Sequence, residues 1–261
     1  MLIIGEKLNS SIPRTLEALN VHNETYFTEM IRAQEDGGAD YIDINTALSG
    51  PKEASDMKWG VKLILEHSKC GIMLDSPNPD VIRNVLPAAG GRKVFINSVT
   101  LDEKYEPLYE TIAAADASVV CLPISGRNIP PTAEQRLENA KKIADKLLSA
   151  GIPKERIYID ILVEAAATDT QAPMTALNTI SVIKKELGLN TICGLSNVSF
   201  GLPRRGTLNA AFLAMGMAAG LDSALLDPTS AKIRETIAAA NALLGNDEFC
   251  LDYISFIRGL K

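Results

Sequence analysis

Short apolar segments alternate with amphipathic segments along the whole chain, and this alternation limits the fold more than any other feature. The short segments are rich in β-branched residues and bounded by turn residues, which is typical of buried strands. Strands are predicted at residues 2–6, 41–45, 71–75, 94–98, 118–122, 156–162, 191–196 and 222–226. Helices are predicted near 24–36 and 54–67, behind the segment 77–79, behind Thr100 as N-cap, near 132–150, 173–187, 208–219 and 230–244, with a last amphipathic stretch at 248–258.

Repeated strand–helix units predict a parallel sheet. Eight such units in 261 residues match the size of a (β/α)₈ barrel, or TIM barrel. An open doubly wound sheet is the alternative, but no GxGxxG follows the first strand and the chain has no P-loop. No linker or change of composition divides the chain. We therefore expect an α/β fold with one barrel domain spanning 1–261.

Polar residues follow most of the predicted strands. In a parallel barrel the carboxyl ends of the strands meet at one face, where such enzymes carry their active sites. Any single Asp or Asn at a strand end is ordinarily a helix cap or a loop residue, and we interpret Asn45 and Asp227 in this way. The full set is too large for that explanation: Glu6, Asn9, Asp43, Asn45, Asp75, Asn97, Ser125, Asp160, Ser196, Asn197 and Asp227.

Bulk composition excludes several classes of function. A net charge of −6 argues against a nucleic-acid-binding surface. No secretory signal and no apolar segment long enough to cross a membrane is apparent. The four cysteines are scattered, which favours reduced thiols in a cytoplasmic protein. With only His22 and His67 available, neither a bound metal nor histidine-based catalysis is expected.

The chemistry of the strand ends indicates the kind of ligand. Phosphate sites use glycine-rich turns and basic residues, and few basic residues follow the predicted strands. Arg127, Arg204 and Arg205 either hold an anionic tail at the rim or are ordinary surface charges. A carboxylate accepts parallel hydrogen bonds from two adjacent N–H groups, and an Asn pairs with an acceptor beside a donor. This favours a flat aminopyrimidinone-type ring, and both a pterin and a guanine-like ring fit.

Five segments resemble one family over essentially the whole chain in order and spacing. They are Gly5-Glu6-Lys7-Leu8-Asn9, Leu74-Asp75-Ser76, Ile96-Asn97-Ser98, Tyr158-Ile159-Asp160 and Gly194-Leu195-Ser196-Asn197-Val198-Ser199. The family is that of the pterin-binding methyltransferases, which includes methyltetrahydrofolate:corrinoid methyltransferases and the folate module of cobalamin-dependent methionine synthase. Dihydropteroate synthases are more distant relatives on the same barrel.

The resemblance implies a role for each matching residue. Asp160 would accept from the amide and amino donors of the pterin, while Asp75 and Asn97 would bind the other ring nitrogens. Asn197 would lie near N5, the atom that carries the methyl group. During transfer, Asn197, Asp160, Asp75 and ordered water would stabilise N5 as it gains a proton.

The remaining implied residues support this set. Ser196, Glu6 and Asp43 would extend the ring of hydrogen bonds, and Arg205 would lie in the loop that faces the folate tail or the partner. The resemblance implies tetrahydrofolate and 5-methyltetrahydrofolate as substrates and a corrinoid (cobalamin) carried by a separate partner protein. It also implies a homodimer with no metal of its own.

Three other functions remain open from the sequence. A dihydropteroate-synthase-like condensation needs a pyrophosphate site, for which the segment 10–14 is a weak match. A folate-binding module without turnover is the non-enzymatic alternative. A Schiff-base lyase is disfavoured because no Lys lies inside a predicted strand end, with Lys7 the nearest.

Overall fold

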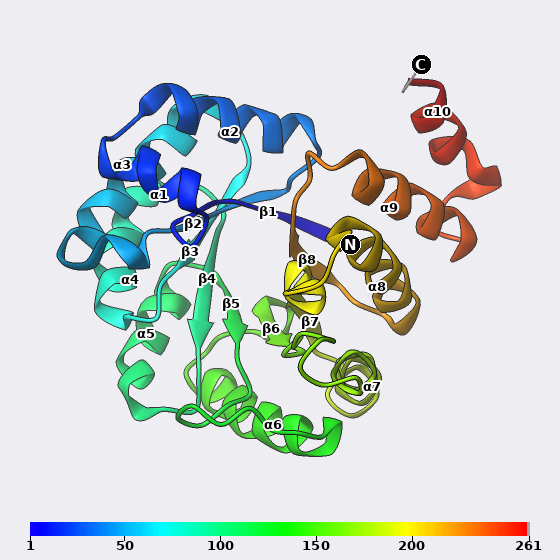
Figure 1. Ribbon diagram of the computed structural model, residues 1–261. Helices are drawn as coiled ribbons and strands as arrows, with labels where there is room; N and C mark the ends of the chain where they lie inside the picture. Colours follow the sequence, from blue (N-terminus) through cyan, green and yellow to red (C-terminus); the bar gives the residue numbers. More distant parts are fainter. Residues whose placement is uncertain (260–261) are drawn as a thin grey trace.

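Eight parallel strands form a closed barrel in the computed structural model, which describes residues 1–259 (Figure 1). The strands pair in chain order, and the last strand pairs with the first. The strands are β1 (Leu2–Asn9), β2 (Tyr41–Asn45), β3 (Gly71–Asp75), β4 (Val94–Val99), β5 (Ser118–Cys121), β6 (Ile157–Asp160), β7 (Asn190–Gly194) and β8 (Ser223–Leu226). The predicted α/β barrel is confirmed, and only the last two residues of the predicted domain lie outside the described part.

Helices follow the strands and surround the barrel (Figure 1). They are α1 (Pro13–Asn20), α2 (Glu24–Asp36), α3 (Glu53–His67), α4 (Pro79–Val85), α5 (Glu106–Ala114), α6 (Ala133–Ser149), α7 (Ala172–Glu186), α8 (Arg205–Ala219), α9 (Ala231–Leu243) and α10 (Leu251–Gly259). Short 3₁₀ turns are η1 (Ala47–Lys52), η2 (Leu86–Ala89), η3 (Glu103–Tyr105), η4 (Lys154–Arg156), η5 (Leu195–Ser199) and η6 (Glu248–Cys250). The last helix, α10, lies outside the ring and contacts α9.

Some local predictions differ from the structure. The strand β1 continues to Asn9, beyond the predicted end at residue 6, and β6 ends at Asp160, two residues before the predicted end. Thr100 is not the N-cap of α5, because its hydroxyl accepts from the Asp102 N–H and η3 precedes the helix. The helix α1 was not predicted, since it is only eight residues long and has no side-chain cap. The strand β7 ends at Gly194, two residues early, because the chain turns there into η5.

An apolar layer fills the inside of the barrel. This floor consists of the buried residues Ile4, Met73, Phe95, Val120, Tyr158 and Ile192. The ring of Phe95 packs edge-on against Tyr41 and Tyr158, with centroids 4.9 and 4.7 Å apart. Side chains two positions apart on a strand point to the same face. The residue two positions after each floor residue therefore also points into the barrel, above the floor. In three strands that next inward residue is a polar strand end: Asp75 after Met73, Asn97 after Phe95 and Asp160 after Tyr158.

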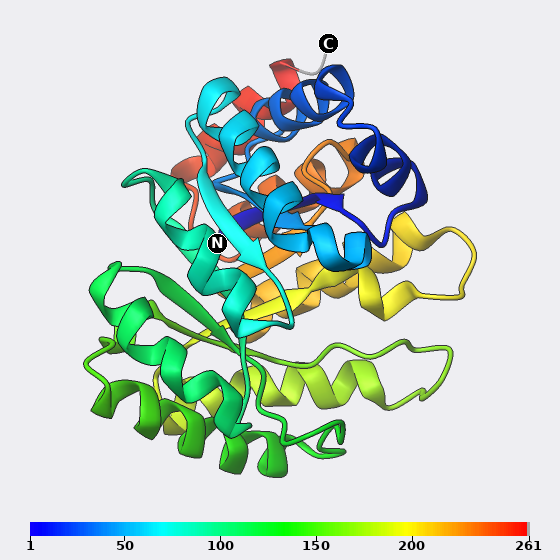
Figure 2. The same cartoon turned by 90° about the vertical axis from the view of Figure 1, so that its left-hand side faces the viewer.

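The segments that follow the strands project from the other side of this floor. Figure 2 shows the segment between β6 and α7 and the segment between β7 and α8 extending from the same end of the molecule. This end carries the polar layer and therefore the candidate site.

Candidate functional site

A cavity of about 850 Å³ lies at the carboxyl ends of the strands. Seven of the eight predicted site residues line it: Glu6, Asp43, Asn97, Asp160, Ser196, Asn197 and Arg205. The barrel therefore brings together residues that are up to about two hundred positions apart in the chain. Asp75 is not among the lining residues, and it lies at the end of β3 as the register partner of the lining residue Asn97 on β4.

Asp75 is held at the end of β3 by the neighbouring strand. The Asn45 Nδ2 donates to Asp75 Oδ2 at 2.8 Å, and the Asn45 oxygen accepts from Ser10 Oγ and the Ala47 N–H. Burial raises the pKa of Asp75 to about 6, against the effect of the Asn45 hydrogen bond, and the charge of Glu53 adds to the rise. Asn45 thus caps its loop, as predicted, and also orients the Asp75 carboxylate.

Asp43 is the most deeply buried of the site carboxylates, with no exposed surface. Within residues 1–259 neither of its oxygens has a hydrogen-bond partner of good geometry. Burial raises its pKa well above the ordinary value, and the charges of Asp75 and Glu6 add to this, while the Asn9 side chain opposes it. A buried carboxyl group without a partner beside a cavity is suited to a ligand that brings its own hydrogen-bonding groups.

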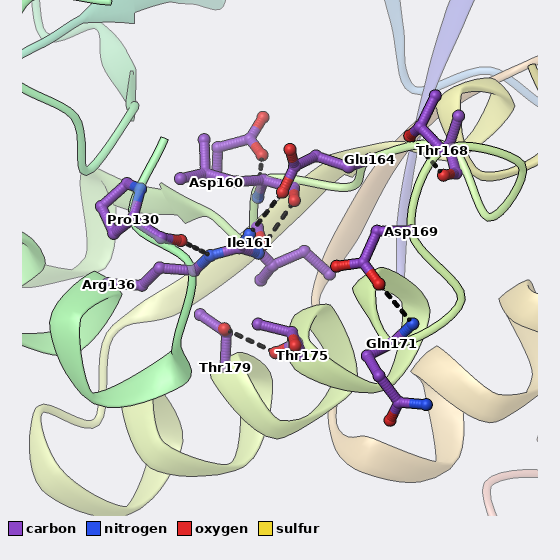
Figure 3. A network of polar contacts seen from close by, with 12 residues as sticks. Pro130, Arg136, Asp160, Ile161, Glu164, Thr168, Asp169, Gln171, Thr175 and Thr179 are labelled. Atoms are coloured by element: carbon purple, nitrogen blue, oxygen red, sulfur yellow. Dashed lines mark hydrogen bonds and ion pairs between the residues drawn. The ribbon is translucent and has the colours of Figure 1, made fainter. Parts of the chain in front are cut away.

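Asp160 ends β6, directly above Tyr158. Its Oδ1 accepts from the Leu162 N–H at 2.7 Å. Burial raises the pKa of Asp160 to about 6, while that hydrogen bond and the nearby charge of Arg136 lower it. Figure 3 shows Arg136 reaching from α6 toward the segment that follows Asp160.

A bulge in β1 shapes the next part of the site. The pairing of β1 with β2 shifts between Gly5 and Leu8, so Glu6 and Lys7 fall in the irregular part. The fully buried Gln34 of α2 accepts from the Lys7 N–H at 2.9 Å and thereby satisfies the backbone there. A side chain at Gly5 would collide with the Gln34 amide. Bulges of this kind re-aim side chains next to active sites.

The two residues in the bulge make separate contacts across the barrel mouth. Glu6 accepts from Ser196 Oγ at 2.7 Å, and Lys7 Nζ pairs with Asp227 Oδ2 at 2.6 Å. Burial raises the pKa of Glu6, the Ser196 hydrogen bond opposes this rise, and the charge of Asp227 adds to it. Asp227 also accepts from the Thr229 N–H, so the predicted loop role is correct but incomplete.

The turn η5 presents Ser196 and Asn197 to the cavity. Arg205 holds this turn, because its guanidinium donates to the Ser196 carbonyl at 2.7 Å and to Ser199 Oγ at 3.1 Å. The Asn197 amide lies over Gly194, where a Cβ atom would approach Asn197 Nδ2 to 3.2 Å. The absence of a side chain at Gly194 therefore leaves room for the Asn197 amide.

The chain matches a family model described as that of pterin-binding enzymes over residues 8–227. This chain belongs to that family. It is 32% identical over 99% of its length to a methylcorrinoid:tetrahydrofolate methyltransferase from Eubacterium limosum, of which it covers 96%. It is also 32% identical to a methionine synthase from Mycobacterium leprae and 30% identical to one from Mycobacterium tuberculosis. Each of these two matches covers 87% of this chain but only 20% of the methionine synthase.

The barrel of this pterin-binding enzyme also resembles a solved structure. It is a dihydropteroate synthase from Coxiella burnetii in complex with pteroic acid, with a TM-score of 0.66 and 20% identity over 83% of this chain and 85% of the other. At that identity the likeness concerns the fold. Within residues 1–259 the helices include none that is long and apolar enough to cross a membrane.

Proposed function

We propose that this enzyme transfers a methyl group between N5 of tetrahydrofolate and the cobalt of a corrinoid carried by a separate protein. The observation that carries the proposal is the cavity itself, in which Asn197 and a set of carboxyl and amide side chains converge above an apolar floor. The Eubacterium limosum relative, similar over nearly its full length, bears the name of this reaction. The chemistry of the residues then assigns the roles.

The ring-binding role falls to Asp160, Asp75 and Asn97. A pterin presents adjacent amide and amino donors on one edge, which match the two oxygens of a carboxylate. Asp160 has one oxygen held by the Leu162 N–H. Asn97 lines the cavity, where its amide oxygen can accept from a ring N–H and its amide nitrogen can donate to a ring nitrogen. With pKa values of about 6, Asp160 and Asp75 are mostly ionised at neutral pH, so they act as acceptors.

The catalytic role of Asn197 is electrostatic and positional. When the methyl group leaves N5 for Co(I), the cobalt electron pair forms the new bond and the N5–carbon electron pair remains on nitrogen. N5 then takes up a proton, and a hydrogen bond to N5 as charge develops lowers the barrier. An amide cannot donate that proton. It can present its oxygen to an N5–H, with Asp160, Asp75 and ordered water completing the network.

Four supporting residues complete the network. Glu6 and Ser196 form one hydrogen-bonded pair, and Asp43 supplies a buried carboxyl group that has no hydrogen bond of good geometry within residues 1–259. Arg205 acts on the network by holding η5 in place. This arrangement assigns Arg205 a structural task at the rim in addition to the predicted contact with the folate tail or the partner.

A dihydropteroate-synthase-like condensation finds less support in the contacts of the segment 10–14. Ser10 is engaged with Asn45 and with the Leu48 N–H, and the Arg14 guanidinium lies over the Tyr26 ring at 5.4 Å. Neither Ser10 nor Arg14 lines the cavity, and Ser11 is the hydroxyl residue of this segment that does. Lys7 is paired with Asp227, which also disfavours a Schiff-base role.

The corrinoid protein is expected to dock on the barrel mouth. Large apolar side chains are exposed on three loops that follow strands, namely Leu48 after β2, Ile129 after β5 and Phe200 after β7. Exposed apolar side chains around a polar cavity are suited to contact a protein partner that brings its cofactor to the cavity.

We propose that a second copy of this chain packs against the helices α9 and α10. These helices and the segment between them expose Leu243, Leu244, Phe249, Leu251 and Ile254, with Leu243 87% and Phe249 82% exposed. Leu243→Glu should convert a dimer into a monomer in sedimentation analysis, whereas Leu148→Glu on α6 should not. A monomeric wild type at micromolar concentration would rule the dimer out.

A reducing compartment such as the cytoplasm suits the four free cysteines, of which Cys70, Cys121 and Cys193 are buried. We propose this location for the protein. Protein fractionation from the source cells would test it directly.

The decisive experiment is methyl transfer from 5-methyltetrahydrofolate to free Co(I) cobalamin, followed by the spectrum of the corrinoid. The wild type should catalyse the reaction, and Asn197→Ala should slow it by about two to three orders of magnitude because one preorganised group is lost. The matched control is Asn190→Ala at the opposite end of β7, where the amide donates to the Glu155 carbonyl. Transfer by Asn197→Ala at the wild-type rate would show that the assignment is wrong.

A further inference from the structure

Arg136 is a buried cation outside the cavity. Its side chain is 1% exposed and lies on the inward face of α6 together with Ala133, Ala140 and Ile143. A charge in such a place is costly unless its donors are paired. The partners of this guanidinium therefore show what it is there to hold.

Nearly all of those partners belong to the segment after β6 (Figure 3). One nitrogen, Nη1, donates to the Ile161 carbonyl at 2.7 Å and to the Leu162 carbonyl at 2.9 Å. The other terminal nitrogen, Nη2, pairs with Glu164 at 2.8 Å, while Nε donates to the Pro130 carbonyl at 2.9 Å. The guanidinium thus connects the segment after β6 to α6 through hydrogen bonds.

One peptide unit links Arg136 to Asp160. The peptide between Ile161 and Leu162 accepts from Arg136 through its carbonyl and donates to Asp160 Oδ1 through its N–H. Leu162 has a φ of 54°, in the left-handed region, which a residue with a bulky side chain adopts only when its surroundings hold it there. Hydrogen bonds on both sides of a peptide strengthen each other, so Arg136 both fixes this unit and polarises its N–H.

We propose that Arg136 is a positioning residue of the pterin site, which acts through the Ile161–Leu162 peptide to fix one oxygen of Asp160 and leave the other for the ligand ring. The inference rests on the proposed function, in which Asp160 binds the ring. Arg136 itself contacts no substrate.

Electrostatics supports the geometry. The charge of Arg136 lowers the pKa of Asp160 against the effect of burial. The Cys193 thiol of β7 also lies near this carboxylate, and its pKa is raised by burial and by the charges of Asp160 and Glu6. Glu164 faces Arg136 from the loop. Loss of the guanidinium should therefore raise the pKa of Asp160 further.

The test compares Arg136→Met with the wild type in two measurements. The first is the pKa of Asp160 in the ligand-free enzyme, from ¹³C carboxyl resonances assigned with Asp160→Asn. The second is the affinity for 5-methyltetrahydrofolate by calorimetry between pH 5.5 and 8. We expect the pKa of Asp160 to rise, the acid limb of binding to move to higher pH, and the affinity at pH 7 to fall at least about tenfold.

Arg156→Met is the matched control at the opposite end of β6. Arg156 donates to the Ala117 carbonyl and pairs with Asp116 at 3.0 Å, so its loss should affect stability without moving either quantity. Arg136→Met with a lower melting temperature but an unchanged Asp160 pKa would overturn the inference and leave a purely structural residue.

Arg136→Lys guards against a variant that does not fold. A lysine keeps the charge but cannot bond four acceptors in the guanidinium plane. It should keep the pKa of Asp160 closer to the wild-type value than Met does and still bind folate more weakly. Wild-type affinity in Arg136→Lys would contradict positioning by the guanidinium. Failure of the proposed function differs from this result, because the wild type would then not bind folate while the Asp160 pKa still responded to Arg136.

Discussion

Asn45 donates a hydrogen bond of 2.8 Å to Asp75, and the two residues are register partners at the adjoining ends of β2 and β3. A flip of the Asn45 amide would break hydrogen bonds, because its oxygen already accepts from Ser10 Oγ and from the Ala47 N–H. Asp75 thus receives a donor of fixed orientation from the neighbouring strand. Burial raises the pKa of Asp75 to about 6, and this contact opposes the rise.

Asn45→Ala should weaken pterin binding. Without this donor the pKa of Asp75 rises further, so a larger fraction is protonated at neutral pH. We expect about tenfold weaker binding of 5-methyltetrahydrofolate at pH 7, with a smaller loss at pH 8, by calorimetry. Asn139→Ala is the control, since that amide donates to the Pro123 carbonyl away from the site. Equal losses in both variants would argue against a specific role for Asn45.

Gly194→Ala should impair methyl transfer while the protein stays folded. The new Cβ atom would approach Asn197 Nδ2 to 3.2 Å, and the amide must then move by a few tenths of an ångström. We expect about a tenfold lower rate constant for transfer to free Co(I) cobalamin, since small misplacements of a catalytic group are costly. Gly259→Ala, which meets no atom within 4 Å, should react normally. A wild-type rate for Gly194→Ala would mean that Asn197 tolerates displacement.

The ligand-free enzyme should lose stability as the pH rises through the titration of Asp160. Its pKa is about 6 in the folded state and about 4 in the unfolded chain, so the folded state binds the proton more tightly. The contribution is therefore largest below about pH 4 and is lost between about pH 4 and 6, by about 3 kcal/mol for a shift of two units.

Asp160→Asn removes this titration but keeps an oxygen for the Leu162 N–H. Urea unfolding at pH 5 and pH 7 should show a smaller difference between the two pH values for the variant than for the wild type. An identical pH dependence in both proteins would show that Asp160 does not titrate in this range. Asp160→Ala should in addition weaken pterin binding by a few kcal/mol, because buried ring donors lose a charged acceptor.

Leu48→Glu should separate partner docking from chemistry. Leu48 is 62% exposed beside the barrel mouth and does not line the cavity. A charge there should raise the KM for the corrinoid protein about tenfold and leave transfer to free cobalamin unchanged. Leu148→Glu, at the far end of α6, is the matched control. If both variants retain the wild-type KM, the partner does not dock over Leu48.

The strand-end residues were predictable because two simple periodicities determine where they lie. A short apolar run ending in Asp75, Asn97 or Asp160 marks a buried strand, and parallel strands in a barrel present their carboxyl ends at one face. The prediction needed no side-chain geometry. It was wrong at the bounds of elements, as at Thr100 and at the ends of β1, β6 and β7.

The residues that hold the site were not predicted. Arg136 and Gln34 are polar residues within amphipathic helices, and polar residues there ordinarily face solvent. A signal was present nevertheless. Arg136 falls on the same helical stripe as Ala140 and Ile143, and Gln34 on that of Phe27 and Ile31. A polar residue at a position that the helical period places on the buried face indicates a hydrogen-bonding partner elsewhere in the chain, which only the tertiary fold brings near.

The apolar floor under the site has a consequence for the order of events. Because Phe95 and its neighbours fill the barrel below the polar layer, the pterin ring and the corrinoid protein of the proposed reaction would both use the opening above that layer. In that case the folate would bind before the corrinoid protein and leave after it. An excess of partner protein should therefore slow the release of labelled folate. A barrel that is filled at one end would in this way let the bound corrinoid protein control the exchange of folate.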